Sequence, residues 1–146
     1  MLKKGRLTSA CPFYIKATNN VFSDEDKLRF LNEKNVWFSS VKTNLSPHLV
    51  PLSFVYVDSF FYLCTPATTQ KIKNLQGNQR VALSLEDAIN VLICEGTADI
   101  LEPPFDSQVL AAFQAKYSWN LERTPKYNRL IRVTPLKVMK YQDSRS

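Results

Sequence analysis

The sequence predicts a mainly β protein of the α+β class, an antiparallel barrel of six strands with two or three short flanking helices. Three observations support this fold class. Aromatic residues make up 12% of the 146 residues, and with the β-branched residues they favour strands. Six apolar runs of strand length are joined largely by short, hairpin-like connections. These runs do not alternate with helices in β-α-β order, which argues against a doubly wound sheet.

The strands are expected where apolar residues cluster between turn residues. Asp58-Ser59 is a tight connection, so the strands on either side of it form a hairpin. Glu95-Gly96 indicates a bulge or a close approach within a long strand, and Pro135 a kink in the last one. The six predicted strands cover residues 36–41, 48–57, 60–64, 80–86, 90–101 and 128–141.

Three helices are predicted from their start and stop signals. Ser23 precedes three acidic residues and caps a helix that ends at Asn35. Thr68 or Thr69 caps a second helix that ends at Gly77. The third covers residues 105–117 by its apolar spacing. Residues 1–20 show no periodicity and are expected to form a loosely attached arm of a single domain, residues 1–146.

Composition narrows the classes of protein. With 45% hydrophobic residues and 3 glycines the chain is an ordered globular protein. Cys11, Cys64 and Cys94 show no C-x-x-C spacing, and no apolar stretch of signal-peptide length follows the basic N-terminus, so we expect a reducing, cytoplasmic location. One His and three scattered Cys make a metal site improbable, and no run is long enough for a membrane span.

The net charge of +6 is unevenly distributed. Residues 123–140 contain six basic residues and no acidic one. This stripe is consistent with nucleic acid, with a phosphorylated ligand, or with a merely solvated strand face. Only Tyr127 and Tyr141 are available there for stacking on bases, so we expect no nucleic-acid binding.

The stretch from Tyr62 to Leu75 predicts a phosphate site. An apolar strand ends there and a helix begins, and the first turn of a helix offers unpartnered N–H groups and a partial positive charge. Thr65, Thr68 and Thr69 add hydroxyl donors, and Lys71 adds a full charge. The alternative is an ordinary capped helix with a solvated lysine.

A second stretch contains a proline within a predicted strand. Because proline has no N–H, we expect the ladder to open at Pro51, which would leave the backbone groups of Val50 and Leu52 free to bind the amide-like edge of a planar heterocycle. An edge strand or a hydrated bulge is the alternative.

Together these two stretches resemble the FMN-binding split barrels related to pyridoxamine 5'-phosphate oxidase, over about residues 32–141. The resemblance implies a homodimer with the flavin in a cleft between the subunits. It also implies that the backbone of Val50, Pro51 and Leu52 faces the isoalloxazine ring. It assigns the phosphate to four residues, Thr65, Thr69, Gln70 and Lys71. The resemblance depends mainly on two segments, residues 48–54 and residues 65–83. The second segment contains Thr65, Thr69, Gln70-Lys71, Asn74-Leu75 and Asn78-Gln79-Arg80. Residues 130–135 match more weakly.

The sequence also departs from that family. Gln70 stands where the oxidase commonly has an arginine, which removes one bidentate phosphate contact. The arginine and histidine that bind the pyridine substrate beyond the last strand have no counterpart, so oxidation of pyridoxamine phosphate is not expected. Asn90 matches a polar position that reaches the flavin across the dimer. Trp119 and Tyr141 either flank the ring or belong to ordinary packing.

The sequence thus predicts an FMN-binding oxidoreductase that transfers hydride or electrons through the flavin to an unknown substrate. No acid–base residue stands out, as is common where the cofactor carries the chemistry. The alternatives are a deazaflavin-dependent reductase, a non-enzymatic flavin or haem binder, and a basic barrel that binds nucleic acid. For haem the sequence offers His48 alone, beside Pro47.

Overall fold

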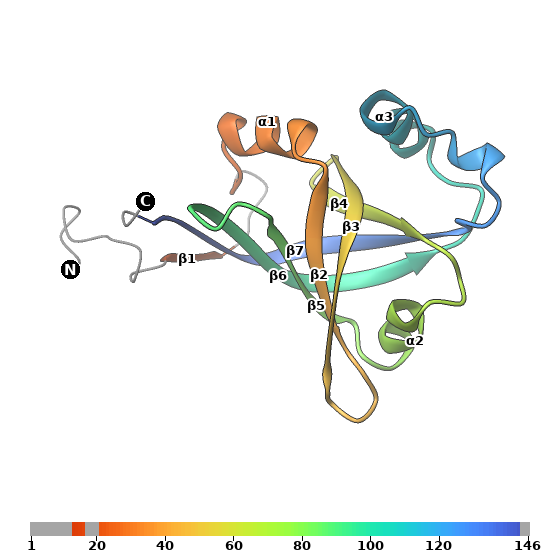
Figure 1. Ribbon diagram of the computed structural model, residues 1–146, viewed down its shortest axis with the longest axis horizontal. Helices are drawn as coiled ribbons and strands as arrows, with labels where there is room; N and C mark the ends of the chain where they lie inside the picture. Colours follow the sequence, from red (N-terminus) through yellow and green to blue (C-terminus); the bar gives the residue numbers. More distant parts are fainter. Residues whose placement is uncertain (1–12, 17–20, 144–146) are drawn as a thin grey trace.

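The computed structural model describes residues 13–16 and 21–143. The chain folds into one antiparallel sheet that closes on itself (Figure 1). The strand order is β1-β7-β4-β3-β2-β5-β6, and an additional pairing of β6 with β7 closes a barrel. The predicted mainly β barrel is therefore confirmed. The strands are β1 (Phe13–Lys16), β2 (Asn35–Val41), β3 (Pro47–Val57), β4 (Phe60–Thr65), β5 (Arg80–Leu85), β6 (Asn90–Leu101) and β7 (Arg129–Gln142).

β7 is the longest strand and joins the two ends of the sheet. One of its edges pairs with β6 from Asn90↔Gln142 to Leu101↔Leu130. The other pairs first with β4 and then, from Lys16↔Lys137 to Phe13↔Lys140, with β1. β1 lies within the arm that was predicted to be loosely attached, so that prediction is wrong for residues 13–16. Four residues are too few for a recognisable period-two pattern; the rest of the arm lies outside the described residues.

Three α-helices accompany the barrel. They are α1 (Asp24–Asn32), α2 (Gln70–Gly77) and α3 (Ser107–Tyr117), and a short 3-10 helix, η2 (Leu121–Arg123), follows. The Ser23 cap is confirmed, with a full capping box to Asp26, but α1 ends three residues before the predicted stop. α1 and α3 lie toward one end of β2 and β3, and α2 lies toward the other end (Figure 1). None of the helices in the described ranges is both long and apolar enough to cross a membrane.

Two apolar clusters explain the pattern of burial. The barrel interior contains Phe38, Phe54 and Phe61, joined by Phe30 from α1 and by Ile72 from α2. A second cluster lies between α3 and the outer face of the sheet, with Val55, Tyr62, Cys64, Val109, Phe113, Leu121 and Leu130. β4 is therefore buried on both faces, which is why its sequence is an unbroken apolar run.

The predicted turn and bulge are confirmed. Asp58 and Ser59 both have positive φ, of 53° and 75°, as a tight two-residue hairpin turn requires. The β6–β7 register shifts between Glu95 and Gly96, where Leu136 is the extra residue on β7. A Cβ on Gly96 would lie 2.2 Å from the carbonyl oxygen of Thr134, so only glycine permits this approach of the two strands.

Candidate anion-binding site

β3 has a free edge over its first seven residues. Its pairing with β2 runs unbroken from Val41↔Pro47 to Asn35↔Ser53, so the predicted opening of the ladder at Pro51 is wrong on this side. Its pairing with β4, on the other side, covers only Phe54↔Leu63 to Val57↔Phe60. Within the described part of the chain, no strand pairs with residues 47–53 on that side, which makes Pro51 an edge-strand proline.

The alternation of backbone groups along β3 shows which of them face the free edge. Successive residues of a strand point their N–H and C=O groups to opposite sides. The Phe54 N–H donates to the Tyr117 hydroxyl, which also donates to the Lys34 carbonyl just before β2. The even-numbered residues, including Val50 and Leu52, therefore face β2. Leu49, Pro51 and Ser53 present their backbone groups to the free edge instead.

The start of α2 lies at the end of β4. Thr69 is the N-cap of α2, but its side chain makes no capping hydrogen bond. Its hydroxyl instead donates to the Pro66 carbonyl over 3.1 Å and lies 3.1 Å from the buried Thr65 hydroxyl. Since Lys73 donates the first helical hydrogen bond, to Thr69 O, the N–H groups of residues 70–72 have no acceptor within the helix. Thr68 is exposed beside them.

Lys71 is buried, with 9% of its surface exposed. No hydrogen bond or ion pair of its amine is found among the described residues, and burial lowers the pKa of Lys71 below its ordinary value of 10.5. The interpretation of Lys71 as a solvated lysine is therefore wrong. A lysine whose side chain is largely buried and whose amine has no protein partner is a candidate for binding an anion, because removing a charge from water is costly unless it is paired.

A polar network links α2 to β2 at this end of the barrel. The side-chain amide of Gln70 donates a hydrogen bond to Asn74 Oδ1. Asn74 Nδ2 in turn donates to the hydroxyl of the buried Ser40 over 3.0 Å. His48 lies opposite Ser40 in the β2–β3 register. The His48 Nδ1 atom is buried and has no hydrogen-bond partner. We call Ser40, His48, Thr65, Thr69, Gln70, Lys71 and Asn74 the anion cluster.

Sequence reasoning did not predict Ser40 or Asn128, and it quoted Asn74 only as part of the family resemblance. Asn74 lies three residues after Lys71 on α2, and the fold brings Ser40 to it. Asn128, which precedes β7, accepts a hydrogen bond from the Ala67 N–H over 3.0 Å and so fixes the loop between β4 and α2. His48 was noted, but not as a neighbour of Lys71.

The remaining predicted site residues lie elsewhere in the chain. Asn90 and Tyr141 line a pocket of about 330 Å³ beside α1. Trp119 packs edge-on against Phe113 and Tyr127 and donates its indole N–H to Thr124. Neither place contains a residue of the anion cluster, so one chain alone does not bring these three to the phosphate residues.

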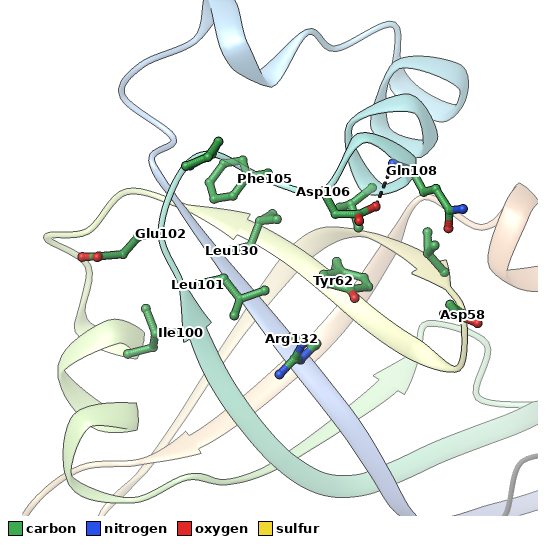
Figure 2. Close-up of a pocket in the computed structure, with 13 residues that line it drawn as sticks. Asp58, Tyr62, Ile100, Leu101, Glu102, Phe105, Asp106, Gln108, Leu130 and Arg132 are labelled. Carbon is green, nitrogen blue, oxygen red and sulfur yellow. Dashed lines mark hydrogen bonds between the residues drawn. The ribbon is translucent and has the colours of Figure 1, made fainter.

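A larger cavity of about 530 Å³ lies on the outer face of β4, β6 and β7, below the start of α3. Figure 2 shows Arg132 and Tyr62 at its floor and Asp106 at the first turn of α3. No predicted site residue lines it.

Three of the basic residues in the stripe of residues 123–140 are ion-paired: Arg132 to Asp99, Arg129 to Glu102 and Lys140 to Asp26. In residues 13–16 and 21–143, no group of His, Cys, Asp or Glu could hold a metal ion.

The chain was compared with families and structures of known proteins. A family model described as Pyridoxamine 5'-phosphate oxidase matches residues 23–142. No curated protein matches the sequence.

Several solved structures share the fold. HutZ, the heme storage protein from Vibrio cholerae, is 15% identical with a TM-score of 0.67, covering 82% of this chain and 96% of HutZ. An F420 reductase is 17% identical with a TM-score of 0.63, covering 77% of this chain and 94% of the reductase. A conserved hypothetical protein from Mycobacterium tuberculosis is 20% identical with a TM-score of 0.67, covering 88% and 89%.

Proposed function

The chain belongs to the pyridoxamine 5'-phosphate oxidase family, and on that premise we propose that it is an FMN-binding oxidoreductase that works as a homodimer. The single observation that carries the proposal is Lys71 at the first turn of α2, a largely buried lysine whose amine has no hydrogen bond or ion pair among the described residues. A phosphate monoester would supply the missing counter-charge and accept hydrogen bonds from the N–H groups of that turn.

The residues present fit the phosphate end of FMN. Lys71 and the first turn of α2 supply the charge and the N–H donors. The hydroxyls of Thr65 and Thr69 already bond to each other and to Pro66, so they hold the loop and need to rotate before they can donate to a ligand. Thr68 is exposed next to them and has no such constraint. Gln70 acts through Asn74 and Ser40 to support the end of the barrel.

The free edge of β3 fits the ring end. The backbone of Val50, Pro51 and Leu52 forms a rigid strip, because its other side is held by β2. The open side presents the carbonyl of Pro51 together with the N–H and C=O groups of Leu49 and Ser53. These backbone groups can match the alternating donors and acceptors of a flavin edge. When bound, the flavin supplies the hydride chemistry, and this chain binds, orients and shields it from water.

The homodimer rests on an exposed apolar surface next to that edge. Trp37 is 42% exposed and lies opposite Pro51 in the register, and Leu49 is 60% exposed. In the same row of the sheet, Trp37 pairs with Ser84 and Ser84 with Ile93, so the surface continues across β5 to β6. A second copy on this face would bury it beside the flavin, and we propose that Asn90, Trp119 and Tyr141 of that copy approach the ring.

Two other cofactors follow from the comparisons. One structural neighbour is named an F420 reductase and another a heme storage protein. A deazaflavin would need the same anion cluster as FMN if it presents a phosphate. A haem with a histidine ligand from this chain would have to use His48, the single histidine. The buried free thiols Cys64 and Cys94 agree with the proposed reducing, cytoplasmic location.

The test is to titrate the purified protein with FMN, a deazaflavin and haem while recording the visible spectrum and the melting temperature. We expect FMN to bind with micromolar or better affinity and to raise the melting temperature, because a ligand that binds only the native state stabilises it. If FMN changes neither quantity, the FMN proposal fails, and the ligand that does change them replaces it.

A further inference from the structure

His48 is a second basic group at the anion cluster. Its ring lies on the inward-facing side of β3, opposite Ser40, and its Nδ1 is buried without a hydrogen-bond partner. The Ser40 oxygen already accepts from Asn74. A buried polar nitrogen without a partner is uncommon in a native structure and needs a physical reason.

The charges that act on His48 are all positive. The imidazole is repelled by two lysines, Lys42 in the turn between β2 and β3 and Lys71 on α2. Its partner in the register on β2 is the neutral Ser40. Among the described residues, no carboxylate contributes to this field. Burial, Lys42 and Lys71 together lower the pKa of His48 below its ordinary value of 6.5. These three influences disfavour the charged imidazole, and an anion nearby would favour it.

We propose that His48 belongs to the anion site and takes up a proton when a phosphate monoester binds beside Lys71. His48 lies opposite Ser40, which accepts a hydrogen bond from Asn74 on α2. Lys71 precedes Asn74 by three residues on the same helix and is close enough to act on the imidazole. The inference rests on the proposed function, and it makes cofactor retention pH-dependent.

The sign of the dependence follows from linkage. An anion near His48 raises the pKa of the imidazole, whereas burial, Lys42 and Lys71 lower it in the protein alone. Between these two values the complex holds one more proton than the free protein. Affinity therefore falls as pH rises through that interval, by at most about tenfold per pH unit for one proton. The ligand's own phosphate titrates near pH 6 in the opposite sense, so sulfate, which does not titrate there, is the cleaner probe.

The sequence offers a direct readout, because His48 is its only histidine. In a protein without a histidine tag, the imidazole C–H signals in an NMR spectrum belong to His48 alone. The pKa of His48 is measured by pH titration without ligand, with sulfate, with FMN and with riboflavin. We expect sulfate and FMN to raise that pKa by about one unit or more, and riboflavin, which lacks the phosphate, to leave it unchanged.

The His48→Asn variant provides the matched control. It keeps a polar side chain of similar reach but cannot take up a proton, so its FMN affinity should lose the component that falls with rising pH. If FMN binds and the pKa of His48 does not move, the inference is wrong while the flavin proposal stands. If sulfate raises the pKa of His48 but FMN does not bind, the anion site stands and the flavin proposal fails. If neither ligand acts, both are wrong.

Discussion

Lys71 illustrates how a single residue can mark a function. Its amine is less than one-tenth exposed, burial lowers its pKa, and no described acid lies within ion-pairing distance. A surface lysine at this position would be no more than a solubilising charge. A largely buried lysine at the first turn of a helix, without a partner among the described residues, is instead the basis of the proposed anion site.

We predict that Lys71→Met weakens FMN about tenfold to a hundredfold, since a hydrogen bond from an ammonium to a phosphate contributes about 1.5–3 kcal/mol. Methionine retains the buried apolar stem, so stability without ligand should be kept or increased. Fluorescence titrations with FMN and riboflavin check this, and riboflavin should not distinguish the variant from the parent. The exposed Lys73→Met, two positions further along α2, is the control. Equal losses for both flavins would show that Lys71 does not hold the phosphate.

At the scale of elements, the contact between β6 and β7 depends on one glycine. Gly96 faces the backbone of Thr134 at the bulge, whereas Gly77, at the end of α2, has its nearest neighbour, Thr43 Cγ2, at 3.8 Å from a built Cβ. The two glycines therefore have different roles: Gly77 is the last residue of α2, and Gly96 lies within β6. Only Gly96 is required by a close approach.

We predict that Gly96→Ala lowers the free energy of unfolding by about 1–3 kcal/mol, because its Cβ would overlap the Thr134 carbonyl and force the two strands apart. Gly77→Ala should be neutral or stabilising by up to about 1 kcal/mol, because alanine is the better helix former. Urea unfolding of both variants measures the difference. A Gly96→Ala protein as stable as Gly77→Ala would contradict the assigned strand contact.

A half-buried lysine also joins three elements at the other end of the barrel. Lys116 on α3 donates to the carbonyls of Phe30 on α1 and Phe54 on β3, over 2.6 and 2.8 Å. Its amine lies 3.6 Å from the centre of the Phe54 ring. Burial, with a smaller contribution from Lys34, lowers the pKa of Lys116 from 10.5 to about 7.

We therefore predict that stability rises from about pH 7 to about pH 8.5. In this interval the unfolded chain binds the Lys116 proton more tightly than the folded one, so removing protons favours the fold. Above about pH 9 the buried thiols Cys64 and Cys94, whose pKa is raised to about 12, act in the opposite direction. Urea unfolding at several pH values measures the slope. Lys116→Met should flatten it and the exposed Lys27→Met should not; an unchanged slope in Lys116→Met would contradict the assignment.

At the scale of the whole molecule, the free edge of β3 and the apolar surface around Trp37 lie side by side on the sheet. Edge strands of this length are usually protected, because they otherwise promote association between chains. A second copy on this face is the proposed protection. It would also complete a site whose residues lie apart in one chain.

We predict a homodimer, with about twice the mass of the 16.8 kDa chain by light scattering. Trp37→Glu should produce a monomer and reduce FMN affinity, because a charge at the centre of the proposed interface is costly to bury. The matched control is Leu28→Glu on the outer face of α1, where leucine is 57% exposed and no interface is proposed. A parent protein that is monomeric with flavin bound would contradict the dimer.

The order of the elements, including the change from strand to helix between Thr65 and Gln70, followed from the sequence, because strand periodicity, turn residues and helix caps act over a few neighbouring residues. The hairpin at Asp58-Ser59 and the bulge at Gly96 were predicted for that reason. The state of Lys71 was not, since burial depends on what the rest of the chain places around an amine. His48, Ser40 and Asn74 come together only when β2, β3 and α2 meet at one end of the barrel. Local chemistry is encoded in the sequence, but the absence of a counter-charge is a property of the packed structure.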